Sequence, residues 1–204
     1  MKLKIWEIAL ALAFLLCALY TALTAAAQEQ LAGKLLRLRV IAASSDPADQ
    51  ETKLAVRDAV LAELCPRLAG AENLPRAEAL AREALPELEA LARAVLADRG
   101  LEIPVSVTLD TETCPTRDYD TFSLPAGEYR TLRVVLGAGE GENWWCVVYP
   151  SLCTDPIETW TEDSDLTEQE TALLTRPKSY VIRFRVLELL ARLRARLKGV
   201  KSGI

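Results

Sequence analysis

The most informative absence in this 204-residue chain is histidine, of which it contains none. Histidine titrates near neutral pH, acts as the base of serine and cysteine hydrolases, and supplies many zinc ligands. Its absence excludes Ser-His-Asp and Cys-His hydrolases and the histidine-containing zinc sites. Chemistry based on carboxylates, lysine or cysteine is still open, but the spacing of the acidic residues singles out no catalytic pair. We therefore expect a protein that is not an enzyme and that needs no metal and no cofactor.

Basic residues are also absent between Val134 and Thr175, where acidic side chains gather. Seven of the acidic residues crowd its second half: Asp155, Glu158, Glu162, Asp163, Asp165, Glu168 and Glu170. Such a composition predicts a flexible acidic linker over residues 154–178. Residues 179–204 reverse the sign of the charge and place Val186, Leu190 and Leu193 at helical spacing. This basic amphipathic C-terminal segment is expected to lie on an anionic membrane surface, to dock on a partner, or to close the domain core.

The N-terminus has the pattern of an export signal. Two lysines, Lys2 and Lys4, precede an apolar run that ends in three alanines at residues 25–27. A basic start, an apolar centre and a small-residue end predict a signal peptide over residues 1–27, with cleavage after Ala27. The run is also about long enough to span a bilayer as an uncleaved anchor. Both alternatives place the rest of the chain outside the membrane.

Five cysteines are present, and Cys17 belongs to the N-terminal leader. The exported part keeps Cys65, Cys114, Cys146 and Cys153. Four cysteines allow three pairings, and disulfides persist outside the cytoplasm. Cys146 and Cys153 are close enough in sequence to pair if the chain reverses at Pro150, which favours a turn. That leaves Cys65 with Cys114 by elimination, the alternative for Cys65 being a buried free thiol near a helix end.

Hydrophobic periodicity predicts a single α+β domain. Alternating apolar residues indicate strands over residues 35–41, 103–110, 129–136 and 144–149. Helical spacing indicates helices over residues 47–64 and 75–97, the first capped by Asp46 and the second kinked or divided at Pro86. We expect a mainly antiparallel sheet of about four strands with the two helical segments on one face.

Three glycines at positions 137, 139 and 141 lead into two adjacent tryptophans, Trp144 and Trp145. The glycines lie between two strand-like segments and are accompanied by Glu140 and Glu142, which repel phosphate. We therefore expect a wide hairpin loop and not a phosphate-binding loop. Since successive side chains of a strand point to opposite faces, one tryptophan is expected to be buried and the other exposed.

Three stretches of the chain resemble the stage II sporulation protein R family. They are LRLRVIAASSDPADQETKLAVRDAVLAEL at residues 36–64, YRTLRVVLGAGEGENWWCVVYPSLC at 129–153 and VIRFRVLELL at 181–190. The resemblance implies a family domain over residues 34–153. The family-motif positions that it assigns are Asp46, Gln50, Lys53, Val56, Arg57, Asp58, Pro125, Gly127, Glu128, Gly137, Asn143, Trp144, Trp145, Cys146, Pro150 and Cys153.

The resemblance also implies a function. Members of the family are signals of endospore formation, exported from the forespore into the space between the two septal membranes. There they activate a membrane-embedded aspartic protease of the mother cell, which trims the precursor of sigma-E. We expect Glu142, Asn143, Trp144 and Trp145 to contact this partner or to present the contact, and nothing indicates nucleic-acid binding. The competing interpretation is a disulfide-stapled structural module of the cell envelope that triggers no proteolysis.

Overall fold

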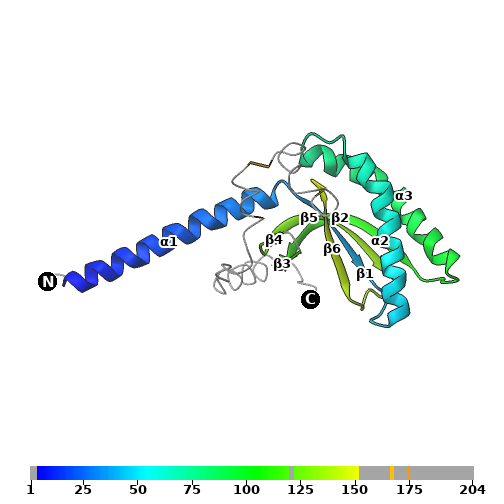
Figure 1. The fold of residues 1–204 in the computed structure, drawn as a ribbon, viewed down its shortest axis with the longest axis horizontal. Helices are drawn as coiled ribbons and strands as arrows, with labels where there is room; N and C mark the ends of the chain where they lie inside the picture. Colours follow the sequence, from blue (N-terminus) through cyan, green and yellow to red (C-terminus); the bar gives the residue numbers. More distant parts are fainter. Residues whose placement is uncertain (1–3, 120–121, 152–165, 168–173, 175–204) are drawn as a thin grey trace.

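The computed structural model describes residues 4–119, 122–151, 166–167 and 174 (Figure 1). Its helices are α1 (Ile5–Ala32), α2 (Pro47–Leu68) and α3 (Leu74–Asp98). Its strands are β1 (Leu36–Ile41), β2 (Val105–Cys114), β3 (Arg117–Asp118), β4 (Ser123–Leu124), β5 (Gly127–Leu136) and β6 (Asn143–Tyr149). The expected acidic linker lies almost entirely outside the described residues, and the basic C-terminal segment lies wholly outside them.

Strands β2, β5, β1 and β6 form one sheet in that order. Strand β1 is parallel to β5 and antiparallel to β6, while β2 and β5 are antiparallel. The prediction of a mainly antiparallel four-stranded sheet is therefore confirmed. The expected hairpin between β5 and β6 is wrong, because β1 lies between them, and the chain crosses the end of β1 to pass from one to the other.

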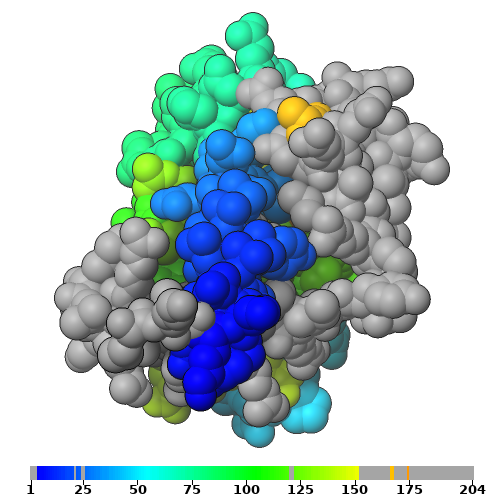
Figure 2. Space-filling model, turned by 90° about the vertical axis from the view of Figure 1, so that its left-hand side faces the viewer, coloured from blue at the N-terminus to red at the C-terminus, as the bar shows by residue number. Residues whose placement is uncertain are grey.

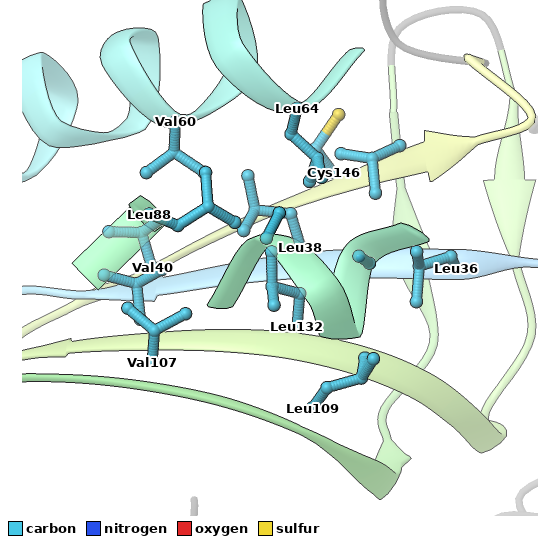
Figure 3. Close-up of a cluster of buried hydrophobic side chains, with 14 of the residues drawn as sticks. Leu36, Leu38, Val40, Val60, Leu64, Leu88, Val107, Leu109, Leu132 and Cys146 are labelled. Atoms are coloured by element: carbon cyan, nitrogen blue, oxygen red, sulfur yellow. The ribbon is translucent and has the colours of Figure 1, made fainter. Parts of the chain in front are cut away.

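Helices α2 and α3 pack together and cover one face of the sheet (Figure 1). Alternate residues of every sheet strand point into this aliphatic core, which also takes Val60 and Leu64 from α2 and Leu88 from α3 (Figure 3). Each residue labelled in that view is less than a tenth exposed. The two-helix layer predicted from helical spacing is thus confirmed.

Helix α3 continues through Pro86 as one helix, so the alternative of two consecutive helices is wrong, while the alternative of a kink at Pro86 stays a prediction. Asn73 caps its N-terminus, where the side-chain oxygen accepts a hydrogen bond from the Arg76 amide at 3.0 Å. Pro86 itself is exposed, while Ala84 and Leu88 beside it are buried. A proline removes one helical hydrogen bond, and on the solvent side water can satisfy the carbonyl that is released.

The opposite face of the sheet is also covered. A second buried cluster there contains Leu31 and Leu35, which flank the end of α1, together with Tyr129 and Val147. Strand β4 of the short β3–β4 ribbon adds Leu124, and Phe122 lies directly before this strand. The sequence analysis did not predict this ribbon, whose strands have two residues each. Leu166 and Leu174 belong to the same cluster, so both faces of the sheet are buried.

Helix α1 extends away from the domain, and Figure 2 views it from its free end. Many of its large apolar side chains are exposed, among them Trp6 at 62% and Phe14 at 78%. Within the described part of the chain, no helix reaches the length and hydropathy that a membrane span requires. The signal peptide and the anchor therefore both stay predictions.

Candidate partner-binding site

The loop that joins β5 to β6, residues 137–142, is here called the glycine loop. It lies against the chain that leaves β1, where the Gly141 amide donates to the Ala42 carbonyl at 3.0 Å and the Glu140 amide to the Ala43 carbonyl at 3.2 Å. At its start, the Gly137 amide donates to the Pro104 carbonyl at 2.8 Å. These bonds fix the loop to the end of the sheet where β1 ends and β6 begins.

None of the three glycines can be replaced without rearrangement, and at Gly139, where φ is +67°, a Cβ would lie 2.6 Å from a methyl carbon of Val135. Gly137 has a φ of +58°, a left-handed conformation that side chains disfavour, and a Cβ there would lie 2.9 Å from the Cβ of Ala43. At Gly141, a Cβ would overlap the Ser44 carbonyl oxygen. The glycines therefore permit close approach of two backbones, which explains the pattern without a phosphate ligand.

The N-terminus of α2 holds the segment before it through a short hydrogen-bond network. The Ser44 hydroxyl donates to the Asp49 carboxylate at 2.6 Å and accepts from the Asp46 amide at 3.1 Å. The Gln50 side-chain amide donates to the Ser44 carbonyl at 2.8 Å. Asp46 is the N-cap residue, as predicted, but its side chain makes no capping bond. Ser44 and Asp49 were not among the predicted positions, although they lie within the same stretch of sequence.

Lys53 connects α2 to the glycine loop. Its ammonium group donates to the Gln50 side-chain oxygen at 2.5 Å and to the Glu142 carbonyl at 3.2 Å. The residue is only 6% exposed. Burial lowers the pKa of Lys53, while the nearby Glu142 carboxylate acts to raise it and Arg57 to lower it further. Gln50 and Lys53, taken from the family motif, thus hold the loop in place.

Trp144 follows the loop and meets α2. It is half-buried against the aliphatic core, and the Arg57 guanidinium lies 5.0 Å from the centre of its ring. Arg57 is held in turn by the Asp58 carboxylate at 2.6 Å. One helical turn before Arg57, the apolar side chain of Leu54 is 38% exposed. With the exposed Glu142, these residues form what is here called the Trp144 surface, an aromatic and apolar patch with charges of both signs.

Trp145 points to the opposite face of the sheet. The guanidinium of Arg39 lies 4.8 Å from the centre of its ring and donates to the Asn143 side-chain oxygen at 2.9 Å. The Glu112 carboxylate binds Arg39 and Arg133, each at 3.2 Å. The two tryptophans therefore lie on opposite faces, as predicted. The expectation that one is buried and the other exposed is wrong, because each is partly covered by the layer on its own side.

The structure gathers part of the predicted motif and separates the rest. Asp46, Gln50, Lys53, Arg57, Asp58, Gly137, Glu142, Asn143, Trp144 and Trp145 lie around the glycine loop and the beginning of α2. Pro125, Gly127 and Glu128 lie at the start of β5, at the opposite end of that strand, and Pro150 follows β6. Val56 is fully buried in the aliphatic core.

The cysteine predictions have different outcomes. Cys114 is a free thiol on the sheet face opposite α2, so the expected disulfide with Cys65 is absent. The physical reason is topological, since Cys65 lies in the last helical turns of α2, on the other side of the sheet. Cys146 is buried in the aliphatic core. Cys153 lies outside the described residues, so the Cys146–Cys153 disulfide stays a prediction.

Among the described residues there is no group of three or more potential ligands that would hold a metal ion. A small cavity lies at the far end of β6, where Tyr149 and Pro150 meet Gly33, Lys34, Asn73, Leu74, Pro75 and Leu166. None of the described residues that line it carries a carboxylate, and none belongs to the glycine loop. The chemistry that the described site offers is contact through an aromatic and charged surface.

Fold and site together define a small α+β domain that carries a long apolar N-terminal helix and an aromatic surface suited to binding. The family model for stage II sporulation protein R matches residues 32–159, more than half of the chain, and the chain belongs to this family. This confirms the resemblance found in the sequence and implies a role in sporulation.

A curated relative, stage II sporulation protein R of Bacillus subtilis (strain 168), is 34% identical over 118 residues. The match covers 58% of this chain and 53% of the relative, so this chain spans about half of the relative's length. No solved structure matches the chain.

Proposed function

We propose that this chain is an exported signal of endospore formation that activates a membrane-embedded aspartic protease of the mother cell. In this proposal the protease trims the sigma-E precursor after it binds the chain in the space between the two septal membranes. The chain acts as a ligand and performs no catalysis itself. Family membership supports the role in sporulation. Export, binding to the protease and activation of precursor trimming are what we propose in addition.

The observation that carries the proposal is the Trp144 surface. Trp144 stays partly exposed although Arg57 packs on its ring, and Leu54, one helical turn before Arg57, and Glu142, two residues before Trp144, are exposed as well. Tryptophan and arginine are enriched among the residues that dominate protein–protein binding energies. A firmly held loop beside them lowers the entropy cost of binding, because the contact does not have to be ordered on association.

The N-terminal helix agrees with export. Exposure of its apolar side chains to water is unfavourable, whereas a signal peptide or an anchor places such side chains in a bilayer. Either form leaves the domain outside the membrane, where it can reach a receptor there. We further propose that the basic C-terminal segment adds contact with an anionic membrane surface.

The proposal is tested by reconstitution in a host that does not sporulate. The chain is exported together with the membrane protease and the sigma-E precursor, and trimming of the precursor is followed on a gel. We expect trimming only when the chain is present. Absence of trimming, with the folded chain shown to be exported and an established activator working in parallel, would contradict the proposal for this protease.

The surface is then tested with matched variants. Arg57→Ala removes the partner of Trp144 and is expected to reduce trimming at least tenfold, which corresponds to about 1.4 kcal/mol of binding. Arg93→Ala removes an exposed arginine of α3 that also pairs with a carboxylate, and it is expected to leave trimming unchanged. If Arg57→Ala supports as much trimming as Arg93→Ala and the unchanged chain, the Trp144 surface is excluded as the contact.

A further inference from the structure

Strand β2 forms one edge of the four-stranded sheet. Its ten residues, Val105 to Cys114, pair with β5 in one antiparallel register. Within the described part of the chain, no strand pairs with the other side of β2. Along an antiparallel strand, successive residues direct their backbone N–H and C=O groups to alternate sides, so about half of the residues of β2 direct both groups away from β5. The outer edge of β2 is therefore a row of hydrogen-bonding groups that another strand can use.

Folded proteins usually protect an edge strand, and β2 has few of the protective features. Common ones are a short strand, a proline or lysine within it, and a bulge that twists it away. Strand β2 is longer than the average strand of about 5–6 residues. It contains neither proline nor lysine, and its register with β5 has no shift. Of its two acidic residues, Glu112 is bound over the sheet by Arg39 and Arg133, which leaves Asp110. An edge this long and regular is a template for pairing with another chain.

The side chains beside this edge differ between the two faces of the sheet. On the face covered by α3, Val105, Val107 and Leu109 belong to the aliphatic core. On the opposite face, Ser106 and Asp110 are exposed, and Asp110 forms no ion pair with a described residue. A strand added to β2 therefore meets apolar side chains on one face and an unpaired carboxylate on the other. Such an edge is complementary to a segment in which apolar and basic residues alternate.

We propose that the outer edge of β2 binds an extended segment of another protein, in which apolar and basic residues alternate, as an additional strand. In this mode of binding, backbone hydrogen bonds give the affinity and alternate side chains give the specificity. A lysine or arginine of the segment opposite Asp110 supplies the charge pair that selects it. Strand β6, which carries Trp144, lies at the other edge of the sheet. The β2 edge is therefore a second interaction surface, separate from the proposed contact with the protease.

A second copy of this chain fits the same edge less well. If two antiparallel copies of β2 pair around Leu109, Asp110 lies opposite Thr108 and diagonal to the other Asp110. If they pair around Asp110, the two carboxylates lie directly opposite each other. Like charges opposite each other destabilise strand pairing, and diagonal neighbours are still within reach. Charge therefore favours a basic segment of another protein over self-association through β2.

The test measures amide hydrogen exchange by NMR in the full chain with three synthetic peptides. In the first, valine alternates with threonine and arginine. The second has glutamate in place of arginine. The third is the arginine peptide with methylated backbone nitrogens, which keeps the side chains but loses the backbone donors. At about 1 mM, we expect the arginine peptide to slow exchange at alternate amides of β2 at least fivefold and to leave those of β1 unchanged. The glutamate peptide should bind at least tenfold more weakly, and the methylated peptide should not slow exchange in β2.

The selection by charge is tested by reversing one side chain. Asp110→Lys should exchange the preference, so that the glutamate peptide binds more tightly than the arginine peptide. Glu72→Lys makes the same change of charge in the turn between α2 and α3 and should keep the preference for arginine. Unchanged exchange in β2 with the arginine peptide, equal binding of the methylated peptide, or an unchanged preference in Asp110→Lys would overturn the proposal. Exchange in β2 that slows as the concentration of the chain alone is raised would also overturn it, because the edge would then bind a second copy.

Discussion

The two faces of the same sheet are buried by different chemistry. The helix-covered face is aliphatic, with Leu38 of β1 and Leu132 of β5 fully buried under α2 and α3. The opposite face combines aromatic rings with Arg37, Arg39 and the carboxylate of Glu112. Both chemistries come from one strand, because the apolar residues of β1 alternate with its arginines.

This difference separates the interactions that stabilise the fold from those that orient the side chains of the site. Apolar burial is non-directional, so the aliphatic face supplies stability and fixes which side of each strand faces inward. Hydrogen bonds and ion pairs are directional, so the polar face orients Asn143 and Trp145 through Arg39. Mutations on the two faces should therefore differ in both size and kind.

The largest effect is expected on the aliphatic face. Leu38→Ala removes most of a fully buried side chain and leaves a cavity, which should lower the free energy of unfolding by about 2–5 kcal/mol. The exposed Leu54→Ala serves as the matched control and should change it by no more than about 0.5 kcal/mol. Urea unfolding of both variants measures the difference. Equal losses would mean that the aliphatic face is not the main source of stability.

A smaller effect is expected from the polar face. Glu112→Gln removes the charge that pairs with Arg39 and Arg133, and the loss should be about 1–3 kcal/mol, since these groups are mostly buried. Glu89→Gln removes a carboxylate paired with Arg93 on the surface of α3 and should cost less than about 1 kcal/mol. The same unfolding measurement compares them, and a cost for Glu112→Gln no larger than that for Glu89→Gln would argue against a structural role for this network.

A local effect is expected at the glycine loop. Lys53→Met removes the donor that binds the Glu142 carbonyl, with an expected cost of about 1 kcal/mol. Hydrogen exchange should then be about fivefold faster at the Gly141 amide and unchanged at the Leu132 amide in the sheet centre. Unchanged exchange at Gly141 would show that Lys53 does not hold the loop.

The smallest effect is a pH dependence from the polar face. The folded-state pKa values of Cys114 and Tyr129 are raised above their ordinary values of 9.0 and 10.0. Their contribution to stability is therefore complete below about pH 9 and declines above it, because the unfolded chain loses these protons first. Thermal unfolding at pH 8 and pH 10 should show the decline, and Cys114→Ala should show less of it. An identical decline in that variant would assign the effect to other groups.

The sequence was sufficient for features that depend on local periodicity. Alternation in residues 35–41 and helical spacing in residues 47–64 and 75–97 predicted β1, α2 and α3. The observed elements differ from these predictions only by a few residues at their ends. The glycine pattern predicted a wide hairpin loop, whereas the structure uses the glycines for the close approach of the loop to the chain that leaves β1. Opposite orientations of Trp144 and Trp145 followed from the strand period alone.

Features that depend on long-range pairing could not be predicted. The position of β1 between β5 and β6 joins segments about a hundred residues apart, and no local pattern specifies it. The same placement makes a hairpin between β5 and β6 impossible. Cys65 and Cys114 are separated because they lie on opposite sides of the sheet. Arg37 alternates with the apolar residues of β1, and its burial depends on a second layer built from distant segments. The adjacent tryptophans were the available signal that both faces were covered.

The central claim is that the Trp144 surface contacts the protease, and site-specific photo-crosslinking tests it most directly. A photoreactive residue is placed at Glu142, which is exposed beside Trp144, and, as a control, at Glu72, which is exposed in the turn between α2 and α3. Both proteins are exported in cells that contain the membrane protease. The account predicts a crosslink to the protease from position 142 and none from position 72. A crosslink from position 72 alone, with trimming intact in both proteins, would contradict it.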